Sequence, residues 1–412
     1  MNPLKEKAKN IDSLFMSLDK TYPKPYDKNE TDAYSKTRVI LMNGTEFEQV
    51  WFSHGWQRHE INQDLRRDLA VLRKLEQQQQ KLISCLKPID ETILETTIGY
   101  EQLAVDLTAC MARAEKDPYV KGQLDFALLE DFDHLYRYAD LLEMDMGIKA
   151  EELVNGYTDI MPGRPTISEH RHPFDAIRKP INSSADLLTK LHVNIITAAE
   201  QQTMNYYMNV GSFYKNDLGR KLYAEIAMIE EQHVSEYGSL LDVNCTMLES
   251  LVMHEYTECY LYYSCYMTET NANLKKVWEM LYEQEVSHLH YAIELLQKYE
   301  KKDASSVIGS GDFPTLLDFK SNIDYIRDVM KNTIRNTADK EEIVKVDSLP
   351  KDFRFFTYQE QIISEKKNVP SHAIIDKYIK EHGEDYRYES HPHPIDCLKD
   401  RCCDNTSLGR EA

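Results

Sequence analysis

Three times along this chain a carboxylate is followed thirty residues later by a second carboxylate, with a histidine three positions beyond it. The three sets are Glu101, Asp131 and His134; Glu200, Glu230 and His233; and Glu255, Glu285 and His288. In a helical hairpin, about fifteen residues down one helix and about fifteen back each cover roughly 22 Å, so the first carboxylate returns to the level of the second. Residues three apart share a helix face. The interval therefore predicts three helical hairpins, each with three ligand-type side chains at one level.

The residues around the sets indicate that they are repeats of one structural unit. His134 and His233 are each followed four positions later by a tyrosine and seven and eight positions later by leucines. A helix start is expected between the two carboxylates of every set, at Asp117-Pro118, Asn216-Asp217 and Thr270-Asn271. A single Glu-x-x-His is usually an ordinary surface pair, but three in one register beside apolar residues favour metal ligands.

Length, charge and cysteine usage bound the class of protein. The 412 residues suffice for one large or two moderate domains, and the net charge of -20 argues against nucleic acid or an anionic membrane as a partner. No N-terminal segment resembles a signal peptide, and no apolar run approaches the length of a membrane span. The eight cysteines have no regular spacing, which favours thiols in a reducing cytoplasm.

Changes in composition predict four consecutive parts. These are an N-terminal arm and helix over 1–89, a helical bundle over 90–300, a C-terminal helical extension over 301–385 and a mobile tail over 386–412. The arm is expected to be irregular to about residue 55, and leucine periodicity predicts a helix from about 59 to 86. Within the bundle, four prolines between residues 150 and 183 preclude a single helix and indicate a long crossover.

The three sets resemble the ligand pattern of the ferritin-like di-iron carboxylate superfamily, which includes rubrerythrins, bacterioferritins and manganese catalases. The resemblance covers about residues 90–300 and rests on the three carboxylate pairs with their histidines. It implies an all-α fold: a ferritin-like helical bundle, here built from three repeated hairpins instead of two, with irregular N- and C-terminal extensions. It also implies a cofactor of two iron ions, with manganese as the alternative, held among the nine residues of the three sets.

The sequence leaves open which two hairpins form the site. In the superfamily the chain runs back along the bundle between the hairpins, and the 66 residues from His134 to Glu200 allow this, whereas the 22 from His233 to Glu255 do not. Topology therefore pairs the first two sets. Ligand type favours the second and third, because Asp131 is one methylene shorter than the usual glutamate. All nine residues stay metal candidates, and topology is given more weight. If the first two sets form the site, the third serves a second site across a homodimer interface, or is a structural copy whose acids pair with arginine or lysine.

Two further clusters are less specific. Glu169-His170-Arg171-His172 lies in the expected crossover, where the histidines would be outer hydrogen-bond partners of the site if the crossover passes over the bundle mouth. An ordinary surface loop is the simpler interpretation. His391, His393, Cys397, Cys402 and Cys403 in the tail match no standard zinc-site spacing.

An oxygen-rich site with two histidines suits iron or manganese with open positions for dioxygen or peroxide. We therefore expect a cytoplasmic dinuclear-metal oxidoreductase that activates or reduces dioxygen or peroxide, with or without oxidation of an organic substrate. The chain has no Cys-x-x-Cys, so we expect an external electron donor protein. One alternative is an iron-binding or storage protein of the ferritin type, although the regions 1–90 and 300–412 would obstruct shell assembly. The other is a non-catalytic helical scaffold.

Overall fold

The computed structural model of the chain describes residues 1–363, 369–383 and 385–387. The expected all-α class is confirmed, because the described residues are helical apart from loops and one small hairpin, in which β1 (Asn336–Asp339) pairs antiparallel with β2 (Glu342–Lys345). Among the described helices, none combines the length and the apolar character needed to cross a membrane. The expected mobile tail, with its histidines and cysteines, lies outside the described residues from 388 onward.

Eight helices of more than twenty residues dominate the described part of the chain, and the last six of them contain the predicted ligand positions. They are α1 (Ala33–Gln57), α2 (Gln63–Ser84), α3 (Ile93–Ala114), α4 (Pro118–Met146), α7 (Leu187–Val210), α8 (Asp217–Gly238), α9 (Met247–Thr268) and α10 (Ala272–Glu300). The crossover holds the short helices α5 (Ala150–Leu153) and α6 (Thr166–Glu169) and one 3-10 turn (Pro173–Asp175), so it is not a single helix, as its prolines predict. After α10 come α11 (Ser305–Ile308), α12 (Ile323–Thr333), α13 (Arg354–Ile363) and α14 (Pro370–His382).

Helix α1 occupies part of the segment that the sequence analysis expects to be irregular. The expectation is wrong for residues 33–57, where the side chain of Asp32 accepts a hydrogen bond from the backbone N–H of Tyr34 and caps the helix start. The prolines that suggest an irregular arm, Pro23 and Pro25, lie before this cap.

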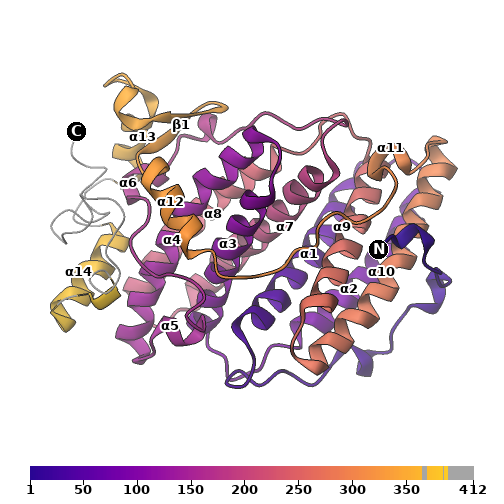
Figure 1. The fold of residues 1–412 in the computed structure, drawn as a ribbon, viewed down its shortest axis with the longest axis horizontal. Helices are drawn as coiled ribbons and strands as arrows, with labels where there is room; N and C mark the ends of the chain where they lie inside the picture. Colours follow the sequence, from indigo (N-terminus) through magenta and orange to yellow (C-terminus); the bar gives the residue numbers. More distant parts are fainter. Residues whose placement is uncertain (364–368, 384, 388–412) are drawn as a thin grey trace. The chain divides into compact units, whose positions relative to one another are not determined.

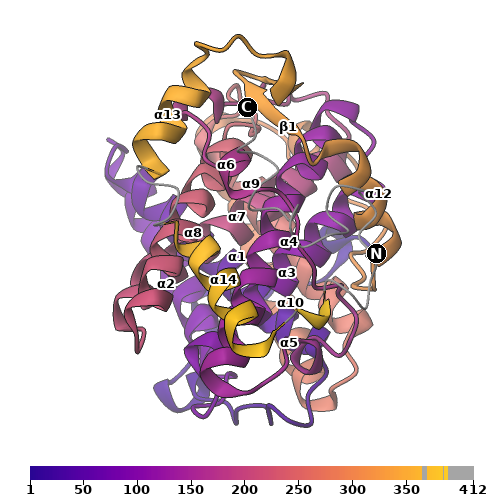
Figure 2. The ribbon, with the colours of Figure 1, turned by 90° about the vertical axis from the view of Figure 1, so that its left-hand side faces the viewer.

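The chain forms two compact units, each assembled from separate stretches of sequence. Unit 1 comprises residues 1–91, 180–202 and 241–318, and unit 2 the remainder. Unit 1 contains α1, α2, α9 and α10 (Figure 1), and unit 2 contains α3, α4, α8 and α14 (Figure 2). The division falls within the continuous helix α7, after Gln202. This organisation differs from the four consecutive parts expected from the sequence.

The long helices repeat with a constant spacing. Gln63 and Asp217, Ile93 and Met247, and Pro118 and Ala272 are the first residues of paired helices, and each pair is 154 residues apart. The helix caps repeat as well, since Thr92 and Thr246 each form a capping box with a glutamate. The chain therefore contains two structural copies of a four-helix segment, over residues 33–147 and 187–301, and we call the spacing of 154 residues the repeat offset.

Each unit combines helices from both copies. In unit 1, α1 packs against α9 and α2 against α10; in unit 2, α4 packs against α8. The consecutive helices α3 and α4, and likewise α9 and α10, form closely packed hairpins. Because of this exchange, residues that are far apart in the sequence meet inside each unit.

Candidate metal centres in the two helical units

The first and second predicted sets are brought together. Two groups of side chains have ligand-type atoms within 4.8 Å of one another: Asp131, Glu200, Glu230 and His233, and Glu101, His134 and Glu230. Glu230 belongs to both groups, so it would be shared between them if each group held a metal ion. All six side chains are buried. The five members on α3, α4 and α8 all belong to unit 2, and Glu200 on α7 is a further candidate ligand.

Local sequence sets the level of the ligands on each helix. The side chain of Asp117 accepts hydrogen bonds from the backbone N–H groups of Tyr119 and Val120 and so fixes the start of α4, as predicted. Asp131 and His134 follow about four turns later on one face. The caps of α8 and α10, Asn216 and Asn271, are also those predicted.

Both imidazoles face the ligand group with Nδ1 and an outer carboxylate with Nε2. In His134, Nδ1 lies 3.1 Å from Oε1 of Glu230 and Nε2 lies 3.8 Å from Oε2 of Glu169. In His233, Nδ1 lies 3.6 Å from Oε2 of Glu230 and Nε2 lies 2.6 Å from Oε2 of Glu130. Histidines that bind metals usually direct the second nitrogen to a carboxylate in this way. The two rings are therefore oriented as metal ligands.

Buried arginines hold the two outer carboxylates. Arg171 donates two hydrogen bonds to Glu130, one of which joins Nη2 and Oε2 at 2.9 Å. Arg137 donates from Nη2 to Oε1 of Glu169 at 2.5 Å. All four side chains are buried, so each charge depends on its partner.

The crossover reaches the site through Glu169 and Arg171. Its histidines have other contacts: Nε2 of His170 lies 3.9 Å from Oε1 of Glu225, and the side chain of His172 accepts a hydrogen bond from the N–H of Phe174. The outer partners of the ligand histidines are thus carboxylates, not the crossover histidines that the sequence analysis considered.

The ligand group has strongly shifted proton affinities. Burial raises the pKa of Asp131 to about 6, although the neighbouring His233 opposes this effect. Burial alone would lower the pKa of His134, but hydrogen bonds with Glu169 and Glu230 raise it well above the usual value. Burial would raise the pKa of Glu230, yet the two histidines lower it to about 2. The group therefore retains protons in positions where a divalent cation would displace them.

Several ligand-type atoms have no hydrogen-bond partner among the described residues. These are both carboxylate oxygens of Asp131, Oε2 of Glu101 and Oε2 of Glu230. Buried polar atoms without partners are uncommon in folded proteins and call for a physical explanation, such as a bound ion. Carboxylate oxygens and imidazole nitrogens are the donors that iron and manganese take in proteins. The residues present fit a pair of such ions.

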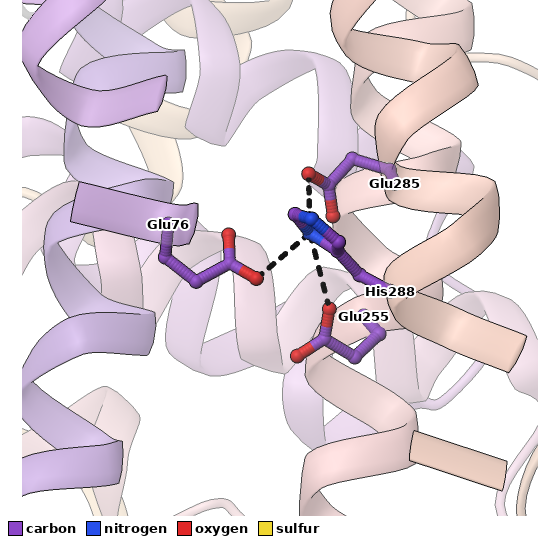
Figure 3. A group of neighbouring side chains, drawn as sticks. All are labelled: Glu76, Glu255, Glu285 and His288. Carbon is purple, nitrogen blue, oxygen red and sulfur yellow. Dashed lines mark ion pairs between the residues drawn. The ribbon is translucent and has the colours of Figure 1, made fainter. Parts of the chain in front are cut away.

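The third predicted set lies in unit 1 and meets Glu76 of α2. Glu76, Glu255, Glu285 and His288 form one group of ligand-type atoms within 4.8 Å of one another (Figure 3). A second group consists of Glu46, Glu76 and Glu258. Nδ1 of His288 lies 2.9 Å from Oε1 of Glu76 and 3.0 Å from Oε1 of Glu285. The third set therefore has partners within its own chain.

Glu46 and Glu76 are not among the nine predicted ligands, although the same thirty-residue interval separates them. The histidine that marks the other sets is replaced here by Gln79. Glu46 and Glu76 precede Glu200 and Glu230 by the repeat offset, so the interval without its histidine would have identified them.

A cavity of about 450 Å³ in unit 2 borders the outer layer of the site. Among the residues that line it are His170, Arg171, Gln232, Tyr358, Ile362 and Val369. Arg171 also contacts Glu130, and Gln232 donates a hydrogen bond to the backbone carbonyl of Glu169. None of the six ligand-type residues lines the cavity, so a small molecule there would contact the groups that orient the histidines.

Comparison with known proteins gave no support for a particular family: no protein-family model, curated protein or solved structure matches the chain. The two clusters of buried carboxylates and histidines are the features of the molecule that indicate a function. The cluster with Glu230 has the larger number of imidazoles, and it has an outer layer of paired charges.

Proposed function

We propose that the cluster around Glu230 binds two iron or manganese ions and uses them to activate or reduce dioxygen or peroxide. The observation that carries this proposal is the sharing of Glu230 between two ligand groups, which together offer four carboxylates and two imidazoles. Dinuclear sites in ferritin-like bundles use this combination, with a Glu-x-x-His pair on each of two helices. We further propose that α3, α4, α7 and α8 form such a ferritin-like arrangement.

The two groups divide the ligands between two ions. Asp131, Glu200 and His233 would hold one ion and Glu101 and His134 the other, with Glu230 between them. Ions held in this way would exchange electrons with dioxygen or peroxide. Four ionised carboxylates would balance the charge of two divalent ions, which favours the oxidised forms of the ions.

The outer carboxylates keep the histidines in the tautomer that a metal needs. Oε2 of Glu130 lies 2.6 Å from Nε2 of His233, so a proton on that nitrogen is favoured and Nδ1 is left for a metal ion. Glu169 lies on the same side of His134, at 3.8 Å from its Nε2. Burial would raise the pKa of Glu130, but the guanidinium of Arg171 outweighs it and holds that pKa far below its usual range. The carboxylate therefore stays ionised.

Repeated turnover requires electrons from outside the chain. The sequence has no Cys-x-x-Cys pair of the kind found in rubredoxin-like modules. We propose a separate donor protein, and the net charge of -20 favours a donor that presents a basic face.

The test is anaerobic loading with ferrous iron, followed by mixing with peroxide. Near-ultraviolet absorbance should rise as peroxide oxidises ferrous ions to ferric. Glu230→Ala with His233→Ala should lower that change in proportion to the bound iron that the variant loses. Glu231→Ala, on the exposed side of α8, is the matched control and should alter neither. If the double variant loses iron but the unmodified protein shows no absorbance change with peroxide, the site binds iron without reacting. That outcome would exclude the oxidoreductase. Uptake of many ions per chain would instead indicate storage.

A further inference from the structure

We propose that unit 1 contains a second dinuclear metal centre, more selective for manganese than the centre around Glu230. Its ligands are Glu46, Glu76, Glu255, Glu258, Glu285 and His288. This inference does not depend on the function proposed above, because all six residues belong to unit 1.

The six side chains converge from four helices. Figure 3 shows Glu255, Glu285 and His288 pointing from α9 and α10 toward Glu76 on α2. Glu76 is common to both ligand groups of unit 1, in the way that Glu230 is common to the other two groups. All six side chains are at most 1% exposed, so water cannot solvate their charges. The geometry is that of two adjoining ion positions with a bridging carboxylate.

The carboxylates have no cationic partner other than His288. Among the described residues, none of the five glutamates forms an ion pair with arginine or lysine. Both oxygens of Glu258 and Nε2 of His288 have no hydrogen-bond partner there. Unpaired buried charges on this scale are strongly unfavourable, and shared divalent cations would compensate them. The alternative expected from sequence, a structural copy neutralised by basic side chains, is not what the structure contains.

The ligand positions of unit 1 also match those around Glu230 at the repeat offset. The matching pairs are Glu46 and Glu200, Glu76 and Glu230, Glu255 and Glu101, Glu285 and Asp131, and His288 and His134. Five of the six positions thus keep a carboxylate or an imidazole where the other centre has one. The match is independent of the distances inside unit 1 and points to the same kind of site.

The sixth position differs between the centres. His233 corresponds to Gln79, and Glu130, which faces His233, corresponds to Gln284. Gln79 donates a hydrogen bond from Nε2 to Oε1 of Gln284 at 3.1 Å. An amide pair therefore replaces the imidazole and its outer carboxylate.

Glu258 supplies a ligand in place of the absent imidazole. It corresponds to Ala104, so the other centre has no equivalent carboxylate. Glu258 groups with Glu46 and Glu76, which match two members of the group that contains His233. One ion position in unit 1 is therefore surrounded by carboxylates alone.

The replacement of an imidazole by the carboxylate of Glu258 determines which metal unit 1 prefers. Unit 1 offers five carboxylates and one imidazole, against four and two around Glu230. Carboxylate oxygens suit manganese, whereas imidazole suits iron and zinc. We therefore assign manganese to unit 1 when both metals are supplied.

Metal content and electron paramagnetic resonance of the full chain test the proposal. Protein loaded with Mn²⁺ should bind two ions in each centre and show the spectrum of a coupled manganese pair. Glu258→Ala should remove one ion of the unit 1 pair and abolish its coupling. Adding Gln79→His to that variant should restore the ion and shift its preference toward iron, because the ligand set then equals that around Glu230.

Matched variants separate this proposal from the proposed function. Glu294→Ala, on the exposed side of α10, should leave the metal content unchanged. The double variant Glu230→Ala with His233→Ala should still bind a manganese pair, and adding Glu258→Ala should disrupt that pair. This result would establish the unit 1 centre even if the oxidoreductase proposal fails. The proposal of a unit 1 centre would be overturned if Glu258→Ala and Gln79→His, introduced without other substitutions, left the metal content and the spectrum unchanged. Circular dichroism checks that each variant is folded.

Discussion

Nε2 of His233 lies 2.6 Å from Oε2 of Glu130, and at the repeat offset the same two helix positions hold the hydrogen-bonded pair Gln79 and Gln284. One unit thus has an imidazole with an ionised partner where the other has two neutral amides. A carboxylate can orient a ligand histidine and strengthen its binding to a metal, whereas an amide pair has neither effect. The two units have diverged at the point that most affects metal chemistry.

The Glu130–His233 contact predicts that Glu130→Gln weakens metal binding without removing a ligand. The amide no longer stabilises the proton on Nε2 of His233, so the affinity for one ion should fall about 10–100-fold. Competition with a chelator measures this change. Glu152→Gln, an exposed substitution, is the control. Unchanged affinity would mean that Glu130 serves only to balance Arg171.

Arg171→Ala should destabilise the protein strongly. Arg171 donates hydrogen bonds to Glu130 and Glu236, so its loss leaves two buried carboxylates short of a partner. The expected decrease in the free energy of unfolding is about 3–5 kcal/mol, measured by urea denaturation. Arg220→Ala removes an exposed contact with Asp217 and should cost no more than about 0.5 kcal/mol. Equal effects of the two variants would contradict the structural role of Arg171.

Gly163→Ala should displace the crossover. A Cβ at this position would lie 2.6 Å from the carbonyl oxygen of Leu129 and 3.0 Å from the backbone nitrogen of Asp133, so the backbone must move. We expect a loss of about 1–3 kcal/mol in unfolding free energy and weaker metal binding, because the crossover carries Arg171. Gly122→Ala, where nothing lies within 4 Å, should instead stabilise α4 by up to about 1 kcal/mol. Thermal unfolding distinguishes the two outcomes.

Metal-free protein should lose stability as pH rises above 4.5, the ordinary pKa of glutamate. Burial, followed by repulsion from neighbouring carboxylates, raises the pKa of Glu46, Glu76 and Glu255 well above this value. The folded state then binds more protons than the unfolded state, so the unfolding free energy falls as pH rises toward the folded-state pKa. The raised pKa of His288, where Glu285 outweighs burial, acts in the same direction.

Urea midpoints of chelator-treated protein between about pH 5 and pH 8 measure this dependence. Glu258→Gln should reduce the slope, since burial raises the pKa of Glu258 as well and the amide does not titrate. Saturating Mn²⁺ should remove or reverse the decrease of unfolding free energy with rising pH, because the ions stabilise the ionised carboxylates. A metal-free protein whose stability rises through this range would show that these carboxylates are ionised in the fold without a cation.

Local sequence determined the helices and the level of the ligands on them. The caps Asp117, Asn216 and Asn271 act on the backbone of the next few residues, so they are recognisable without the rest of the fold. The thirty-residue interval follows from helix rise in the same way. Helix α1 was missed for a physical reason: buried polar residues such as Arg38 and Glu46 interrupt its apolar pattern.

Only the tertiary structure decided which hairpins meet. The pairing of α9–α10 with α1–α2 joins helices that begin more than 200 residues apart. Burial of apolar surface is non-directional, so several partners would satisfy an amphipathic hairpin. Asp131 and His134 lie beside Glu230 and His233, the grouping that the length of the crossover favours, because chain length restricts which helix ends can meet. It did not identify Glu76 as the partner of His288. That contact exists because each unit takes its hairpins from different copies of the repeat, and no local interaction in the sequence specifies such an exchange.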